Sequence, residues 1–230
     1  MTKSHPLTIG KVTMPVTSFK DRVRAEMIRS AADYKCNFID CEYLVCSDAF
    51  NDRKFFIIDG KAENYKHLTG VNSALDPITF FTKCFDGSLA LGDFDFNKAG
   101  ESEKDTIGTV RRKIAVLPDM VRLFQNHQIM TEENFVKNRI TCSFATTDGL
   151  CTVGFIHTSK SRPKTLLKGN VLNPQTMKPV CLLIRKTAGQ QRFGELLIGD
   201  SEAFLNYYSD IKDSVDENLT RTLLGSTAKK

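Results

Sequence analysis

Two of the four histidines stand in segments whose residue types suit proton transfer and phosphate binding. His67 lies in "ENYKHLTGV", directly after an apolar run and shortly before Gly70. His157 ends the apolar run "GFIH", and the basic segment "TSKSRPKT" follows it at once. An imidazole is suited to acid and base catalysis because its ordinary pKa is near neutral pH.

These residue types fit metal-free cleavage of a phosphodiester bond. Cutting RNA through its own 2′-hydroxyl needs a base for that proton, an acid for the departing 5′-oxygen and fixed positive charge for the transition state. Side chains of His, Lys and Arg with a hydroxyl are sufficient, so we expect no metal and no organic cofactor. The alternative for His67 is a structural imidazole that bonds to a neighbouring carbonyl, and His157 can equally be an ordinary residue at a strand end.

Several other chemistries have no support in the sequence. There is no GxxxxGK[ST] loop, no glycine-rich dinucleotide fingerprint, no HExxH and no GxSxG. Cys36, Cys41 and Cys46 are spaced so that strand residues would point to opposite faces, which argues against a zinc site. The 7 cysteines are scattered through apolar segments and are typical of reduced thiols, which favours a reducing compartment.

The distribution of charge is more informative than the net charge of +5. Between Gly149 and Gly194 there is no Asp or Glu, and this basic window contains Lys160, Arg162, Lys164, Lys168, Lys178, Arg185, Lys186 and Arg192. Like charges without counter-charges attract a polyanion such as RNA or DNA. The alternative is a solvated basic face that keeps the protein in solution.

The first half of the chain predicts helices with two strands between them. Ser18 and Asp21 open an amphipathic helix, and Asp76 with Pro77 opens another that ends near Gly87. "ENYKHLTG" predicts a short helix that ends at Gly70. A helical period also runs over 105–125, where Pro118 predicts a kink or a division. The two strands are "NFIDCEYLVCS" and "KFFIIDG".

The second half predicts successive strands and then a helix. The strands are "RITCSFATT", "CTVGFIHT", "VCLLIRKT" and "FGELLIGD", and the helix is "SEAFLNYYSDI". We therefore predict an α+β fold with an antiparallel sheet of about four to six strands packed by helices. We expect a single domain over 1–230, with a helical N-terminal extension over 1–50, a core over about 51–212 and a disordered tail over about 218–230.

The motifs between the second strand and the basic window resemble a known family. The run "FFIIDGKAENYKHLTGVNSALDPITFFTKCFDGSLALGDFDF" and the later "SKSRPKTLL" are similar to a phage-associated family of barnase, EndoU, colicin and RelE-like nucleases. The similarity covers roughly Phe55 to Arg185 and rests on Asn64, Tyr65, His67, Leu68, Thr69, Gly70, Phe80, Phe81, Gly87, Leu89, Asp93, Phe94, Pro163, Lys164, Thr165 and Leu166.

The resemblance implies a metal-independent ribonuclease fold, in which a four-stranded antiparallel sheet displays the active groups on its open face. We expect His67 to act as general base or acid, and Lys164, Thr165 and Arg185 to stabilise the cleaved phosphate. Nucleic acid would also contact Thr69, Lys160, Arg162 and Lys168. The alternatives are that Thr69 bonds within its own helical turn and that Lys164 and Thr165 lie in a plain solvated loop.

Two functions therefore remain open. The first is a cytoplasmic ribonuclease of phage or prophage origin with toxin character, acting on RNA, with an antitoxin, immunity or host defence protein as a further candidate partner. The second is a non-catalytic binding module of the same fold that holds nucleic acid, a nucleotide or a host protein. No segment has the length of apolar sequence that a membrane helix needs, so we expect no membrane partner.

Overall fold

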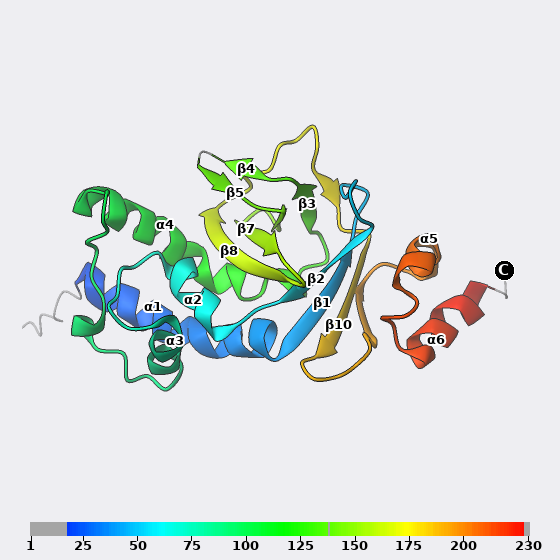
Figure 1. Cartoon of the computed structure of the whole chain (residues 1–230), viewed down its shortest axis with the longest axis horizontal. Coiled ribbons are helices and arrows are strands. Elements are labelled where there is room, and N and C mark those ends of the chain that lie inside the picture. The colour runs from blue at the N-terminus through cyan, green and yellow to red at the C-terminus, as the bar shows by residue number, and fades with distance from the viewer. Residues whose placement is uncertain (1–17, 138, 228–230) are drawn as a thin grey trace, which may run out of the picture.

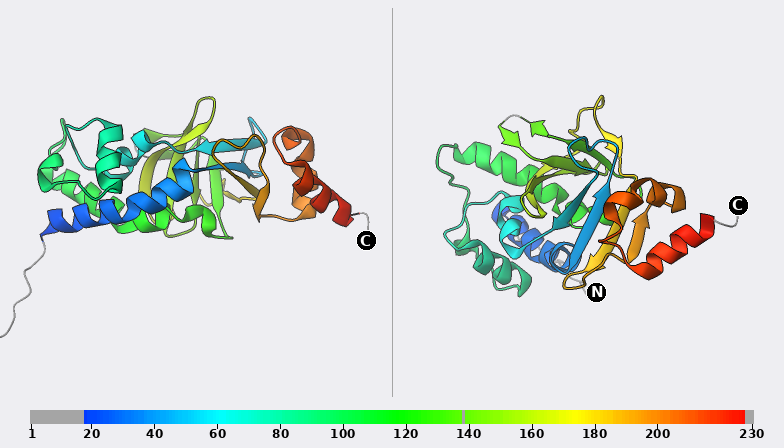
Figure 2. Two further views of the ribbon diagram at one scale, coloured as in Figure 1. Left: turned by 90° about the horizontal axis from the view of Figure 1, so that it is seen from below. Right: turned by 45° about the vertical axis from the view of Figure 1, so that its right-hand side comes forward.

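The computed structural model describes residues 18–137 and 139–227 of the chain, so residues 1–17 of the expected extension and 228–230 of the expected tail lie outside it. The described residues form a curled sheet between two groups of helices (Figure 1). Helices α1 (Phe19–Tyr34), α2 (Ala62–Thr69), α3 (Pro77–Phe85) and α4 (Glu103–Met120) gather at one end, and α5 (Ser201–Ile211) and α6 (Glu217–Thr227) at the other, as the two further views in Figure 2 also show.

The described sheet has nine strands in the order β11-β10-β1-β2-β8-β7-β6-β3-β9. Every neighbouring pair in it is antiparallel except β2 with β8. A separate hairpin joins β4 (Val136–Lys137) to β5 (Ile140–Thr141). The strands of the sheet are β1 (Cys41–Cys46), β2 (Phe55–Asp59), β3 (Met130–Glu133), β6 (Phe144–Thr147), β7 (Cys151–His157), β8 (Ser161–Lys168), β9 (Lys178–Pro179), β10 (Leu182–Thr187) and β11 (Glu195–Ile198).

The predicted α+β class is confirmed, and the predicted four to six strands are too few. No strand was predicted over β3, β8 or β9. The "SKSRPKTLL" segment, for which a solvated loop was one alternative, lies largely in β8, and Pro163 is inside that strand. Proline cannot donate to a strand ladder, but β8 pairs with β2 only at Ser161, and its register with β7 shifts at a bulge opposite Pro163. The missing N–H of Pro163 is tolerated because β2 pairs with β8 only at Ser161 and does not extend as far as Pro163.

The predicted helix starts agree with the structure. Ser18 and Asp21 form a capping box at α1, and the Asp76 carboxylate accepts hydrogen bonds from the Ile78 and Thr79 N–H groups at α3. Helix α2 ends at Gly70, whose φ of 79° is in the left-handed region that glycine adopts most readily. Pro118 lies in the last turn of α4, and a short 3₁₀ turn, Leu123–Gln125, follows.

The two faces of the sheet bury different cores. On β1, Tyr43 and Val45 face the larger core with α1 and α4, and Leu44 and Cys46 face the smaller core with α5. Because β1 pairs with both β2 and β10, the segment from Phe19 to Cys46 is part of the central packing of the molecule.

The C-terminal segment differs from the expected disordered tail. Residues 217–227 form α6, whose start is held by the Asp216 carboxylate, which accepts a hydrogen bond from Asn218 N–H at 2.8 Å. Leu219 and Leu223 lie one turn apart and pack into the smaller core. These two leucines give α6 an apolar face that packs against the smaller core, which explains why residues 217–227 form a helix.

The junction between β2 and α2 depends on close contact at Gly60. A Cβ atom there would lie 2.8 Å from both the Cβ and the carbonyl oxygen of Phe38, in a π-helical turn, Lys35–Ile39. We predict that Gly60→Ala lowers the free energy of unfolding by about 1–3 kcal/mol, because backbone must shift to admit the methyl group. Urea denaturation measures the change.

The matched control is Gly108→Ala in α4, where the nearest atom to an added Cβ is 3.6 Å away. That variant should be neutral or more stable by up to about 1 kcal/mol, since alanine favours a helix. Equal unfolding midpoints for both variants would show that the junction is not tightly packed.

Candidate functional site

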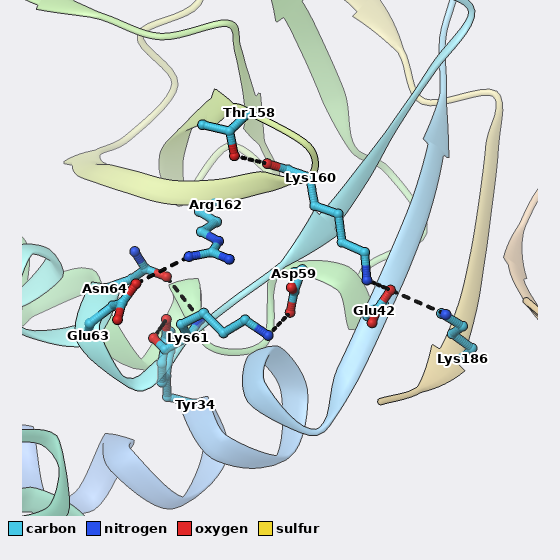
Figure 3. Close-up of polar contacts among 10 residues, drawn as sticks. All are labelled: Tyr34, Glu42, Asp59, Lys61, Glu63, Asn64, Thr158, Lys160, Arg162 and Lys186. Carbon is cyan, nitrogen blue, oxygen red and sulfur yellow. Dashed lines mark hydrogen bonds and ion pairs between the residues drawn. The ribbon is translucent and has the colours of Figure 1, made fainter. Parts of the chain in front are cut away.

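A cluster of charged side chains lies where β2 and β10 end, β1 and β8 begin, and α2 starts (Figure 3). We call it the charged cluster, and its members are Glu42, Asp59, Lys61, Glu63, Lys160, Arg162 and Lys186. Two of these, Lys160 and Arg162, were predicted from the sequence to bind nucleic acid. Glu42 pairs with Asp59 on β2 and with Lys186 on β10, so these three residues form one charged row across the three strands.

The register explains why these charges lie at the end of the sheet and not beneath α5. One step along the same face, Leu44 pairs with Ile57 and Ile184, and this apolar row packs beneath α5. The helices therefore cover the apolar row and leave the charged row at the end of the sheet. Alternation along a strand places every second residue on one face, so Glu42 and Leu44 necessarily share theirs.

Glu42 is the centre of the cluster. Its side chain is 9% exposed, and its carboxylate lies 2.7 Å from Lys160 Nζ and 3.4 Å from Lys186 Nζ. Lys186 also donates to the Gln190 carbonyl at 2.7 Å and lies over the ring of Phe193. A buried carboxylate needs such partners because desolvation of an unpaired charge costs several kcal/mol, of the order of 3–5.

A second acidic group, Asp59, lies beside it. Its carboxylate is 2.9 Å from Lys61 Nζ, and its side chain is 7% exposed. The Tyr34 hydroxyl donates to the Lys61 carbonyl at 3.0 Å. Burial first, and then the charges of Asp59 and Glu63, raise the pKa of Tyr34 well above its ordinary value, so this phenol stays neutral.

Arg162 is the cation of the cluster with the most unused hydrogen-bonding capacity. Its Nη1 lies 3.2 Å from a Glu63 oxygen, and its Nε is buried with no hydrogen-bond partner among the described residues. A guanidinium carries five N–H donors in a planar fork that matches a phosphate or carboxylate. Figure 3 shows Arg162 between Glu63 and Lys160, with its fork directed at Glu63 and the Lys160 amine directed at Glu42.

His67 lies one helical turn beyond Glu63 on α2 and is exposed. Residues four apart share a helix face and are separated by about 6 Å along the axis, so His67 lies one turn from Glu63 on the same side of α2. Its imidazole makes no hydrogen bond within the described part of the chain. Burial, with the positive charges of Lys113, Lys66 and Lys98, lowers the pKa of His67, so the imidazole is neutral at pH 7.

Lys113 of α4 is a neighbour that the sequence analysis missed. Its Nζ donates to the His67 carbonyl at 2.7 Å, and its stem passes over Gly70. Burial, and then the charge of Lys98, lowers the pKa of Lys113 to about 8. No local sequence pattern marks Lys113, because only the packing of α4 against α2 brings it to the histidine.

The "KHLTG" motif has a clear structural role around His67. Leu68 is buried in the larger core, and the buried Thr69 hydroxyl donates to the Lys66 carbonyl at 2.8 Å. Lys66 in turn donates to the Ser73 and Leu75 carbonyls. The motif therefore fixes the end of the helix and leaves the His67 imidazole at the surface. The Thr69 hydroxyl is hydrogen-bonded within its own helical turn and is not directed toward a ligand.

The other residues predicted for the site lie elsewhere. Lys164 is on β8 at the bulge, with its Nζ donating to the Thr141 carbonyl at 2.9 Å, and Thr165 is buried against Gly154. Lys168 is at the far end of β8 from Arg162. Arg185 alternates with Lys186 and so faces the opposite side of the sheet, beside Tyr43, where it binds Glu195 with both ends of its fork at 2.7 and 2.9 Å.

His157 also lies on the other face, because it pairs with Ser161, which alternates with Arg162. Its Nδ1 is 3.1 Å from Ser161 Oγ, and its Nε2 is 2.6 Å from an Arg53 nitrogen. Burial and the charge of Arg53 lower its pKa, so it is a neutral and fully engaged imidazole. It does not share a site with His67.

The basic window is not free of counter-charges in space. Lys160 and Lys186 contact Glu42, Arg162 contacts Glu63, Arg185 contacts Glu195, and Arg192 lies 3.8 Å from Glu217. All four glutamates lie outside the window in sequence. Within residues 18–137 and 139–227, no group of three His, Cys, Asp or Glu side chains is arranged to hold a metal ion.

The described residues form an α+β fold, and comparison with known families identifies the family of the chain. The family model described as phage-Barnase-EndoU-ColicinE5/D-RelE like nuclease4 matches residues 26–197, and the chain belongs to this family. The match begins in α1 and ends in β11, so it includes the N-terminal segment that the sequence resemblance left out. No curated protein and no solved structure matches the chain. In the part of the chain that the structure describes, no helix combines the length and apolarity needed to cross a membrane.

The environment of His67 yields a direct prediction. Its imidazole pKa, followed by NMR titration of the Cε1 proton, should lie below the ordinary value of about 6.5. Lys113→Met should raise that pKa, because one positive charge near the imidazole is removed. Lys178→Met, a change on the exposed strand β9, should leave it as in the wild type. A His67 pKa that does not respond to Lys113→Met would contradict this account of the site.

Proposed function

We propose that this protein is a metal-independent ribonuclease of phage or prophage origin that cleaves RNA through attack by the 2′-hydroxyl. The observation that carries the proposal is His67, an exposed and neutral imidazole without a hydrogen-bond partner among the described residues, one turn from the Glu63–Arg162 pair. Membership of a nuclease-like family supports nucleic acid as the substrate.

The reaction assigns a role to each group. His67 takes the proton of the 2′-hydroxyl, the 2′-oxygen bonds to phosphorus, and the bond from phosphorus to the 5′-oxygen breaks. Arg162 and Lys160 bind the phosphate oxygens as negative charge grows on them. Lys113, with a pKa lowered to about 8, is our candidate for the acid that protonates the departing 5′-oxygen. The products are a 2′,3′-cyclic phosphate and a free 5′-hydroxyl.

This assignment keeps three of the residues predicted from the sequence and sets others aside. His67, Lys160 and Arg162 remain, whereas Thr165 is buried and Arg185 is held by Glu195 on the opposite face. A phosphate would compete with Glu42 for Lys160 and with Glu63 for Arg162. We expect both cations to be released to the substrate, since each side chain is about one-third exposed, 36% and 35% respectively.

The first test is RNA cleavage in excess EDTA. Wild type should cut RNA and leave 2′,3′-cyclic phosphate ends, and His67→Ala should lower the rate by at least about 100-fold, the usual contribution of a general base. The matched control is His127→Ala, which removes another exposed histidine from a loop after α4. RNA that is bound but left intact by wild type would reject the nuclease and favour the non-catalytic binding module.

Arg162 gives a second, independent test of the same site. Arg162→Gln should lower kcat by about 100-fold, because a preorganised donor to the developing charge is lost. Arg162→Lys should recover only part of the activity, since an ammonium lacks the planar fork. Arg221→Gln, on α6, serves as the control for loss of an exposed arginine. Steady-state kinetics with wild-type rates for Arg162→Gln would remove Arg162 from the mechanism.

A further inference from the structure

An open pocket of about 600 Å³ lies next to the charged cluster, at the end of the sheet formed by β10 and β11. The loop that joins these strands forms much of its wall, and Asp216, just before α6, closes one side. Its lining includes Lys186, Gln190, Gln191 and Arg192. Pockets that hold small ligands or ligand fragments commonly measure about 300–1,000 Å³, so this one is large enough for a nucleotide unit.

Lys186 is common to the pocket and the cluster. Its Nζ lies 3.4 Å from the Glu42 carboxylate in the cluster, and its side chain lines the pocket. It is held in place by its hydrogen bond to the Gln190 carbonyl and by the ring of Phe193 beneath it. The pocket therefore adjoins the end of the cluster that Lys186 occupies.

The unused polar groups of the pocket are concentrated on two side chains. The Gln191 amide makes no hydrogen bond among the described residues, so both its donor and acceptor are available. The Arg192 guanidinium has only long contacts, 3.5 Å to the Val215 carbonyl and 3.8 Å to a Glu217 oxygen. Arg185 also lines the pocket, but its fork is occupied by Glu195.

We propose that this pocket is a subsite for a nucleotide of single-stranded RNA that flanks the scissile phosphate. The inference rests on the proposed function and names its substrate class. Arg192 binds the phosphate of that nucleotide, and Gln191 contacts the base edge, which is exposed only when the base is unpaired. The lining contains no aromatic ring, so recognition depends on hydrogen bonds and charge rather than on base stacking.

The experiment uses 2′-O-methyl oligonucleotides, which lack the attacking hydroxyl and are bound without being cut. Fluorescence anisotropy with the full-length chain gives the Kd for a dinucleotide and for a tetranucleotide. We expect Arg192→Gln and Gln191→Ala each to raise the tetranucleotide Kd about tenfold, the equivalent of one good polar contact. Neither change should affect the dinucleotide, which is too short to fill both the cluster and the pocket.

Matched controls separate the subsite from general effects of charge. Arg111→Gln on α4 and Gln128→Ala in the loop after α4 remove the same side-chain types from exposed positions away from the pocket. Arg192→Gln should also reduce the slope of log Kd against log salt by the amount expected for the loss of one phosphate contact, and Arg111→Gln should leave the slope unchanged. Thermal unfolding checks that each variant is folded.

The outcomes are distinguishable from those of the cleavage test. An unchanged tetranucleotide Kd in both pocket variants overturns the subsite, whatever the protein does to RNA. Weaker binding by both variants with no cleavage of RNA by wild type supports the subsite and rejects the nuclease. Equal affinity of wild type for the dinucleotide and the tetranucleotide also overturns the subsite, because the two additional nucleotides of the tetranucleotide would then gain no contact.

Discussion

The buried Glu42 carboxylate is the interaction on which the arrangement of the site depends. It lies on the interior strand β1, in register with Asp59 on one side and Lys186 on the other, and it also holds Lys160 from the turn between β7 and β8. An unpaired carboxylate at this depth would cost several kcal/mol, of the order of 3–5, so β10 and the β7–β8 turn are held at the same end of the sheet. The neighbouring apolar row beneath α5 keeps the register from slipping, because a shift of β1 by one residue would turn Leu44 away from this core to the opposite face of the sheet.

The site that results is a strip rather than a single cavity. It begins at His67 on α2, passes Glu63 and Arg162, continues through Lys160 and Glu42, and ends at Lys186 beside the β10–β11 pocket. Positive and negative charges are mixed along it, and each of its lysines and Arg162 already lies near a carboxylate. Arg162 stands out because its Nε is buried without a hydrogen-bond partner among the described residues, which is costly unless a ligand supplies one.

The end of α2 shows how a motif can serve structure and function together. Gly70 adopts a left-handed conformation, Thr69 closes the last turn and Leu68 anchors the helix in the core. These residues leave His67 at the surface of the helix end. Partial burial first, and then the charges of Lys113 and Lys66, lower its pKa. Both lysines are tied to backbone carbonyls of the same region, so they hold the helix end and also contribute to the low pKa of the histidine.

Much of the fold and part of the site were determined by local sequence. The caps of α1 and α3, the glycine end of α2 and the strands β1 and β2 before it follow from side chains within a few residues of one another. The "KHLTG" motif identified the family and singled out His67 as a candidate. The tertiary structure alone decided that Pro163 lies in a strand and that glutamates from outside the basic window pair with several of its cations. It also decided that Arg162 pairs with Glu63 of α2 whereas Arg185 faces away. The reason is that strand register and the packing of α4 on α2 bring together residues far apart in the chain, such as Lys160 and Glu42, and no local pattern encodes which partners will meet.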